Sequence, residues 1–208
     1  MNRLGYPSWS INGRRWGDLL HYPLWLRAVE RIDVPAGGLV PGPLDIADLP
    51  GPSAAEADPA LGDQWREWWQ AAVLEAFAPR DEEHLTLPGA GVRAPDFDDL
   101  PDPLRELARR RWDPALLRWH EPDEFDESGA PRSTAPDGGK LDIEGDVVRA
   151  VEAEIGQRAE PFVLSLHFLV VADEEIRRAG PREFLVPERL RGTEQYRRWL
   201  HGLVRAIA

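Results

Sequence analysis

An alternating run of apolar residues at positions 161–171 constrains the fold more than any other part of this chain. Every second residue from 162 to 170 is apolar, and in a β-strand such residues share one face. The opposite face is mixed, because it carries Ser165 and His167. We therefore predict an interior strand with one fully buried face, which needs further strands and a covering layer.

Two other segments are strand candidates, residues 183–187 and residues 31–34. Between the first strand and residues 183–187, residues 173–179 predict a short helix. Acidic residues lie in its first turn, arginines lie in its last turn, and Gly180 follows, which is the charge order that a helix dipole favours. From these strands we expect a small, mainly antiparallel sheet.

Several segments repeat apolar residues at helical spacing. The last one is the most regular, because Thr193 can cap it and one continuous apolar stripe follows to Ile207. A helix after Pro59 carries three tryptophans, and Leu74 lies off its apolar stripe. Further helices are predicted after Pro103 and from Asp142 to Gly156. Asp-Pro pairs, which place a carboxylate at the N-cap and proline at the first helical position, occur at 58–59, 102–103 and 113–114.

These patterns predict an α+β fold in which helices pack around the sheet and the C-terminal helix docks on it. The length of 208 residues suits a single domain, 1–208. A break near residue 121 could divide it into a Trp-rich helical part, 1–120, and an α/β part, 140–208. Loops rich in Pro, Gly and Asp or Ala are expected at 35–57, 88–101 and 121–139.

Composition excludes several classes of function. The chain has 37 acidic and 25 basic residues and a net charge of −12, so its surface repels phosphate and nucleic acid is not an expected partner. It has no cysteine, which excludes thiol chemistry and thiolate metal sites. Its longest apolar run is too short to cross a bilayer and its N-terminus lacks a signal core. We expect a cytoplasmic protein with no membrane partner.

Motifs for cofactors and metals fail on inspection. Glycines at 89 and 91 and Ala94 have dinucleotide-fingerprint spacing, but Pro95 and several aspartates follow at once, where a helix N-terminus should meet phosphate. Asp142 opens a segment similar to a calcium loop, yet Ala153 stands where the loop needs glutamate. Gly-x-Ser-x-Gly, the P-loop and zinc-type histidine pairs are absent. The sequence therefore predicts no cofactor and no bound metal.

Nine tryptophans remain, some of them flanked by polar residues, glycine or proline. Tryptophan gives a large contact area with few rotatable bonds, so exposed examples suit a binding surface. With the acidic charge, this predicts a non-catalytic protein, of immunity or adaptor type, that recognises a basic protein. The alternatives are a metal-assisted hydrolase using His120 with the nearby loop carboxylates, and a carbohydrate binder using exposed tryptophan. The sequence leaves the oligomeric state open. Candidate partner-binding residues are Trp9, Trp16, Trp112, Trp119 and His120.

Overall fold

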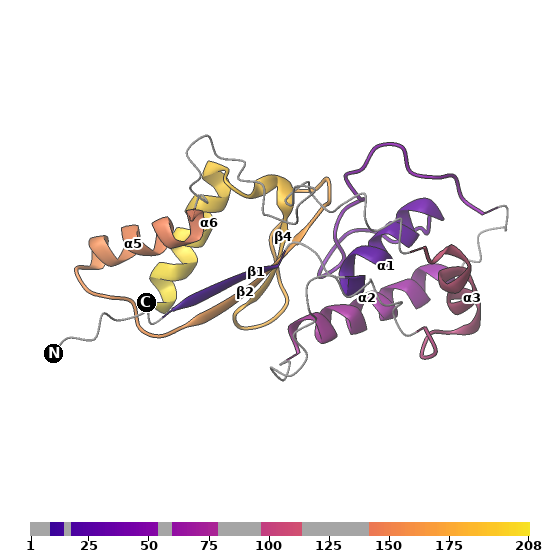
Figure 1. Cartoon of the computed structure of the whole chain (residues 1–208), viewed down its shortest axis with the longest axis horizontal. Coiled ribbons are helices and arrows are strands. Elements are labelled where there is room, and N and C mark those ends of the chain that lie inside the picture. The colour runs from indigo at the N-terminus through magenta and orange to yellow at the C-terminus, as the bar shows by residue number, and fades with distance from the viewer. Residues whose placement is uncertain (1–8, 15–17, 54–59, 79–96, 114–141) are drawn as a thin grey trace, which may run out of the picture.

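The computed structural model describes residues 9–14, 18–53, 60–78, 97–113 and 142–208. In chain order the elements are β1 (Ser10–Arg14), α1 (Asp18–Val29), α2 (Leu61–Phe77), α3 (Asp102–Arg111), α5 (Ile143–Ile155), β2 (Val163–Leu169), β3 (Arg177–Arg178), β4 (Glu183–Pro187), a 3-10 turn (Glu188–Leu190) and α6 (Glu194–Ile207). Figure 1 shows an elongated molecule, with the sheet, α5 and α6 at one end and α1, α2 and α3 at the other.

The sheet has four strands in the order β1-β2-β4-β3. β2 is central and pairs in parallel with β1 on one side and with β4 on the other. β3 is short and pairs antiparallel with β4. The α+β class is thus confirmed, but the sheet is mixed rather than mainly antiparallel. The strand pattern locates each strand, whereas orientation depends on how the connecting segments return, and that is not a local property.

One hydrophobic core lies between the sheet and the helices α5 and α6. Leu164, Leu166 and Phe168 of β2 are almost completely buried, as the alternation predicted. From α6, Tyr196 and Leu200 enter the same core, so the predicted docking of the C-terminal helix on the sheet is confirmed. Thr193 caps α6 by accepting a hydrogen bond from the backbone N–H of Tyr196.

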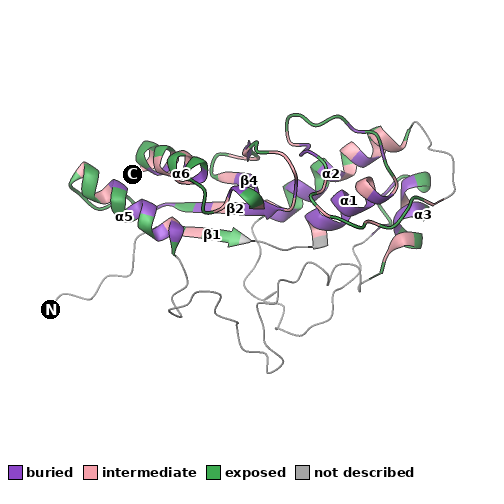
Figure 2. Cartoon of the chain, turned by 90° about the horizontal axis from the view of Figure 1, so that it is seen from above, coloured by how far each residue is buried: buried purple, intermediate pink, exposed green. Residues whose placement is uncertain are grey.

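A second core joins α1, α2 and α3. Trp65 and Trp69 are fully buried on α2, and their rings stack at 5.7 Å with an angle of 4° between their planes. Their indole N–H groups donate to backbone carbonyls, at Pro23 and Leu39, which satisfies both buried donors. The end of β2 contributes Leu169 to this core, and Figure 2 shows buried residues running from β2 into α1.

Two predicted elements are wrong. Residues 173–179 do not form a helix; the carboxylates of Asp173 and Glu175 bind the guanidinium of Arg177, which belongs to β3. Acids followed by arginines suit helix ends, but here the charges satisfy one another within an irregular segment that leads into β3. Residues 31–34 do not form a strand, because they lead the chain out of α1 through a turn in which Arg31 has a φ of 52°.

The sequence also missed α1 and β1. Helix α1 is buried on several sides and contains Pro23, so it lacks the single apolar stripe that marks a surface helix.

Asp102 lies inside the first turn of α3 instead of capping it, and Pro101 is the N-cap. By contrast, the helix predicted from Asp142 is confirmed, with that carboxylate accepting from the N–H of Gly145 and Gly156 in the left-handed conformation at its end.

The single-domain prediction and its subdivision at the loop 121–139 stay predictions. One feature links the two parts: β1, from the N-terminal part, pairs with β2, from the C-terminal part. The expected loop at 121–139 and residues 88–96 of the expected loop at 88–101 lie outside the described residues, and residues 97–101 form neither helix nor strand. In the loop expected at 35–57, residues 35–53 contain two isolated bridges, Gly37 with Val40 and Leu44 with Val171, and no strand.

Candidate functional site

The structure describes two of the five predicted partner-binding residues. Trp9 is half-buried and stacks on Phe162 at 6.3 Å. Trp112 is half-buried and meets the ring of Tyr22 edge-on at 4.8 Å. Each thus presents only part of its ring to solvent. Trp16, Trp119 and His120 lie outside the described residues, and so do the loop carboxylates on which the hydrolase alternative depends. As partner-binding residues, all five stay predictions.

Other residues singled out by the sequence have structural partners. His167 is buried and packs edge-on against Phe77 at 4.6 Å. The carboxylates that resemble a calcium loop are occupied as well, because Arg149 pairs with Asp142 and Asp146. Within the described part of the chain, no three histidine or acidic side chains gather as a metal ion requires. None of its helices is long and apolar enough to span a bilayer.

The outer face of α2 is the first candidate site, and its centre is Leu74. This side chain is 71% exposed, and Val163 is the other large hydrophobic residue that is strongly exposed among the described ones. Leu74 lies opposite the buried stripe of Trp65 and Trp69, so it contributes nothing to the core. Leu74 lies off the apolar stripe in the sequence, but that position alone does not show whether its side chain is exposed or packed against another element.

Carboxylates surround Leu74 along the helix. Glu67 lies about two turns before it and Glu75 directly after it, and both are exposed. Neither carboxylate has a hydrogen bond or ion pair with the rest of the described chain. The basic residue of α2 is Arg66, and its charge is already compensated by Asp63 one turn earlier. We call Glu67, Gln70, Ala71, Leu74 and Glu75 the α2 face; it is acidic, with an apolar side chain at its centre.

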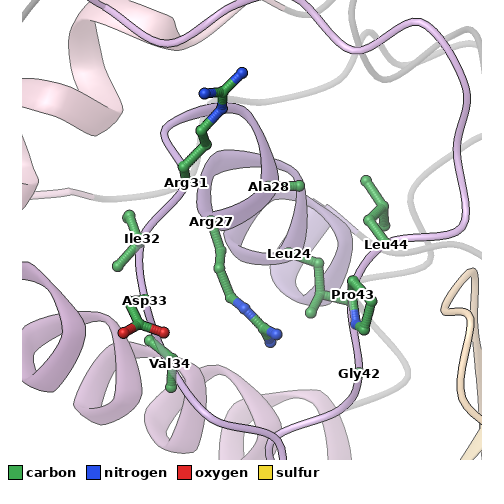
Figure 3. A pocket seen from close by; sticks show the side chains of 10 residues that line it. All are labelled: Leu24, Arg27, Ala28, Arg31, Ile32, Asp33, Val34, Gly42, Pro43 and Leu44. Atoms are coloured by element: carbon green, nitrogen blue, oxygen red, sulfur yellow. The ribbon is translucent and has the colours of Figure 1, made fainter.

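A hollow of about 430 Å³ at the end of α1 is the second candidate. Figure 3 shows its three walls: the last turns of α1, the segment 31–34, and the segment 42–44. Arg27 extends into it from α1, and burial lowers the pKa of this arginine against the opposing effect of Asp173. The sequence did not predict this site, because its walls come from segments that only the fold brings together.

The segment 42–44 is held against the sheet. The backbone N–H of Ala172 donates to the carbonyl of Pro43 at 2.9 Å. The N–H of Gly42 donates to the Asp173 carboxylate, which also binds the guanidinium of Arg177 through both oxygens. A side chain at position 42 would collide with Asp173, since a Cβ there would lie 2.8 Å from its carboxylate oxygen. This wall of the hollow is therefore fixed by the sheet end of the molecule.

Comparison with known proteins gives no relative. The chain matches no protein-family model, no curated protein and no solved structure. Function must therefore be argued from the two candidate surfaces themselves.

Proposed function

We propose that this protein binds a basic protein partner without catalysing a reaction, and that the α2 face is the surface that makes the contact. The exposure of Leu74 is the observation that carries this proposal. A leucine that is 71% exposed gains little hydrophobic free energy from the fold, whereas burial against a partner would recover about 2 kcal/mol.

The charge around Leu74 indicates the kind of partner. Interfaces commonly combine a buried apolar anchor with a polar rim, and the rim sets specificity and the rate of association. On the α2 face, Glu67 and Glu75 form such a rim, and neither has a cationic partner in the described chain. The net charge of −12 adds a long-range attraction for a basic protein. A partner bearing an apolar pocket ringed by lysine or arginine fits this surface.

Affinity purification tests the proposal. The tagged protein would be recovered from cells that produce it, at low and at high salt, beside a Leu74→Ala variant and a Glu67→Gln/Glu75→Gln variant. We expect a basic protein to co-purify at low salt. Each variant should recover it several-fold less, because alanine removes the anchor and the glutamines remove the rim charge. Both substitutions keep good helix formers at exposed positions, so the fold should be retained.

Two matched controls separate the α2 face from a general loss of charge or apolar surface. Val163→Ala removes the other large apolar side chain that is strongly exposed among the described residues, and Glu160→Gln removes an exposed carboxylate near the start of β2. Both should recover the partner as the unmodified protein does. The proposal fails if the recovered partner is acidic, if recovery is insensitive to salt, or if the controls lose the partner as strongly as the α2 variants.

A further inference from the structure

The hollow at the end of α1 contains a cation that is only partly satisfied by the fold. The guanidinium of Arg27 donates one hydrogen bond, from Nη1 to the carbonyl of Pro41 at 2.9 Å, and lies 5.1 Å from the centre of the Trp65 ring. It makes no ion pair with any carboxylate of the described residues. Arginine has five N–H donors, so most of them remain available to a ligand. Figure 3 shows this guanidinium directed into the hollow.

A carboxylate stands on the neighbouring wall. Asp33 is exposed, lines the same hollow, and makes no hydrogen bond or ion pair through its carboxylate with the described chain. Its backbone carbonyl lies close to α2, because a Cβ on Gly62 would approach it to 2.8 Å. The charges of Asp173 and, to a smaller extent, Asp33 both act on Arg27, and neither carboxylate forms an ion pair with it. Arg31 also borders the hollow, but Figure 3 shows its guanidinium directed away from it.

The surface between these charges is about equally polar and apolar. Its apolar part comes from Leu24 and Ile32, with Val34 and Leu44, and all but Leu44 are largely buried in the helical core. A volume of about 430 Å³ lies within the range of small-ligand sites. In such sites a few polar groups orient the ligand, and here the polar groups are Arg27 and Asp33.

We propose that this hollow binds a small zwitterion of the amino-acid type, with its carboxylate on Arg27, its ammonium group facing Asp33, and an apolar side chain against Leu24 and Ile32. Arginine binds carboxylates through two parallel N–H donors, which suits a guanidinium whose donors are free. An anion without an ammonium group would be repelled by Asp33, and an amine without a carboxylate would be repelled by Arg27. This site is separate from the α2 face, so it goes beyond the proposed protein binding.

Three probes of nearly the same shape test the charge pattern. L-phenylalanine is the zwitterion, 3-phenylpropanoate lacks the ammonium group, and 2-phenylethylamine lacks the carboxylate. Calorimetric titration of the full chain should show that L-phenylalanine binds at least about tenfold more tightly than either relative. Binding of none of them at millimolar concentration, or equal binding of 3-phenylpropanoate and L-phenylalanine, would overturn the proposal.

Two variants assign the roles. Arg27→Gln should lower the affinity for L-phenylalanine about tenfold or more, because the glutamine amide cannot form the paired, charge-assisted hydrogen bonds that a guanidinium forms with a carboxylate. Asp33→Asn should remove the preference for L-phenylalanine over 3-phenylpropanoate, and because Asp33 is exposed this variant remains a test if Arg27→Gln does not fold. Asp45→Asn, an exposed aspartate outside the hollow, is the matched control and should leave binding unchanged. Unchanged binding in both hollow variants would also overturn the proposal.

Discussion

Arg31, at the end of α1, has a backbone conformation that usually belongs to glycine. Its φ is 52°, and it follows a helix that ends with two characteristic hydrogen bonds, from the N–H of Ile32 to the carbonyl of Arg27 and from the N–H of Arg31 to the carbonyl of Ala28. This pattern is a Schellman ending, in which the residue at the position of Arg31 is left-handed. For a residue with a Cβ, the left-handed conformation costs about 1–2 kcal/mol.

We predict that Arg31→Gly stabilises the protein. Glycine removes the steric cost at φ 52°, although its greater freedom in the unfolded chain offsets part of the gain, so we expect a net increase of up to about 1 kcal/mol. Urea denaturation would measure it. Asp48→Gly is the comparison, because Asp48 has a φ of 60° but aspartate tolerates this region better, and its gain should be smaller. A loss of stability in Arg31→Gly would show that the arginine side chain makes a stabilising contribution.

At the scale of elements, Glu30 connects three segments through one carboxylate. The side chain is 6% exposed and accepts hydrogen bonds from the backbone N–H and the hydroxyl of Ser53, the latter at 2.6 Å. It also pairs with Arg111, at the end of α3, which in turn donates to the carbonyl of Gly51. The carboxylate therefore joins α1, the segment 51–53 and α3, and removing it would leave the Arg111 guanidinium without its counter-charge.

We predict that Glu30→Ala destabilises the protein by about 3 kcal/mol. Removing one partner of a partly buried ion pair leaves the other charge, here that of Arg111, without compensation. A double-mutant cycle with Arg111→Ala should give a coupling of about 1–3 kcal/mol. The exposed pair of Glu194 and Arg198, both 75% exposed, is the control, and its coupling should be below about 0.5 kcal/mol. Equal coupling in the two cycles would mean that burial does not strengthen the Glu30–Arg111 pair.

The sequence could predict those helices and strands whose defining pattern lies within the element itself. Helix α6 carries its cap and its whole apolar stripe within fifteen residues, and β2 carries its alternation within seven, so local patterns were sufficient. Helix α1 is buried on several sides, and β1, with the sequence SINGR, has little alternation, so both lack the period that marks them. Strand orientation depends on chain connections, which no local period encodes.

The candidate sites were less predictable than the fold. Leu74 was visible as an apolar residue off its stripe, but exposure can be established only when the packing of α2 is known. The polar neighbours of Trp112 in sequence suggest exposure, whereas in the fold its ring contacts Phe97 and Tyr22, and Tyr22 lies on α1, far away along the chain. Arg27 and Asp33 border the same hollow because the chain turns at Arg31 after α1, whereas the sequence predicts a strand at 31–34.

At the scale of the whole molecule, the two hydrophobic cores each contain one buried tyrosine. Tyr22 lies in the helical core and donates to the carbonyl of Ala108. Tyr196 lies in the core beneath the sheet and donates to the Glu144 carboxylate at 2.9 Å. Burial raises the pKa of both phenols well above the ordinary value of about 10, and the negative charge of Glu144 raises the pKa of Tyr196 further.

This difference predicts how stability depends on pH. An unfolded tyrosine releases its proton near pH 10, whereas both buried phenols keep theirs, so the unfolded state binds fewer protons above that pH. Their contribution to stability is therefore complete below about pH 10 and is lost as the pH rises towards the folded pKa values, at about 1.4 kcal/mol per pH unit for each group. Urea denaturation between pH 8 and 11 would measure the slope, and tyrosinate absorbance would report the ionisation.

The two tyrosines also test whether the cores unfold together. If they do, Tyr22 and Tyr196 ionise in one transition that coincides with the loss of structure, and Tyr22→Phe or Tyr196→Phe each removes about half of their joint alkaline slope. If the cores are independent, each variant removes the ionisation of its own core and leaves the other transition in place. A Tyr6→Phe background removes the third tyrosine, which lies outside the described residues. Ionisation of both remaining phenols near pH 10 in a folded chain would contradict their burial, and with it the assignment of one tyrosine to each core.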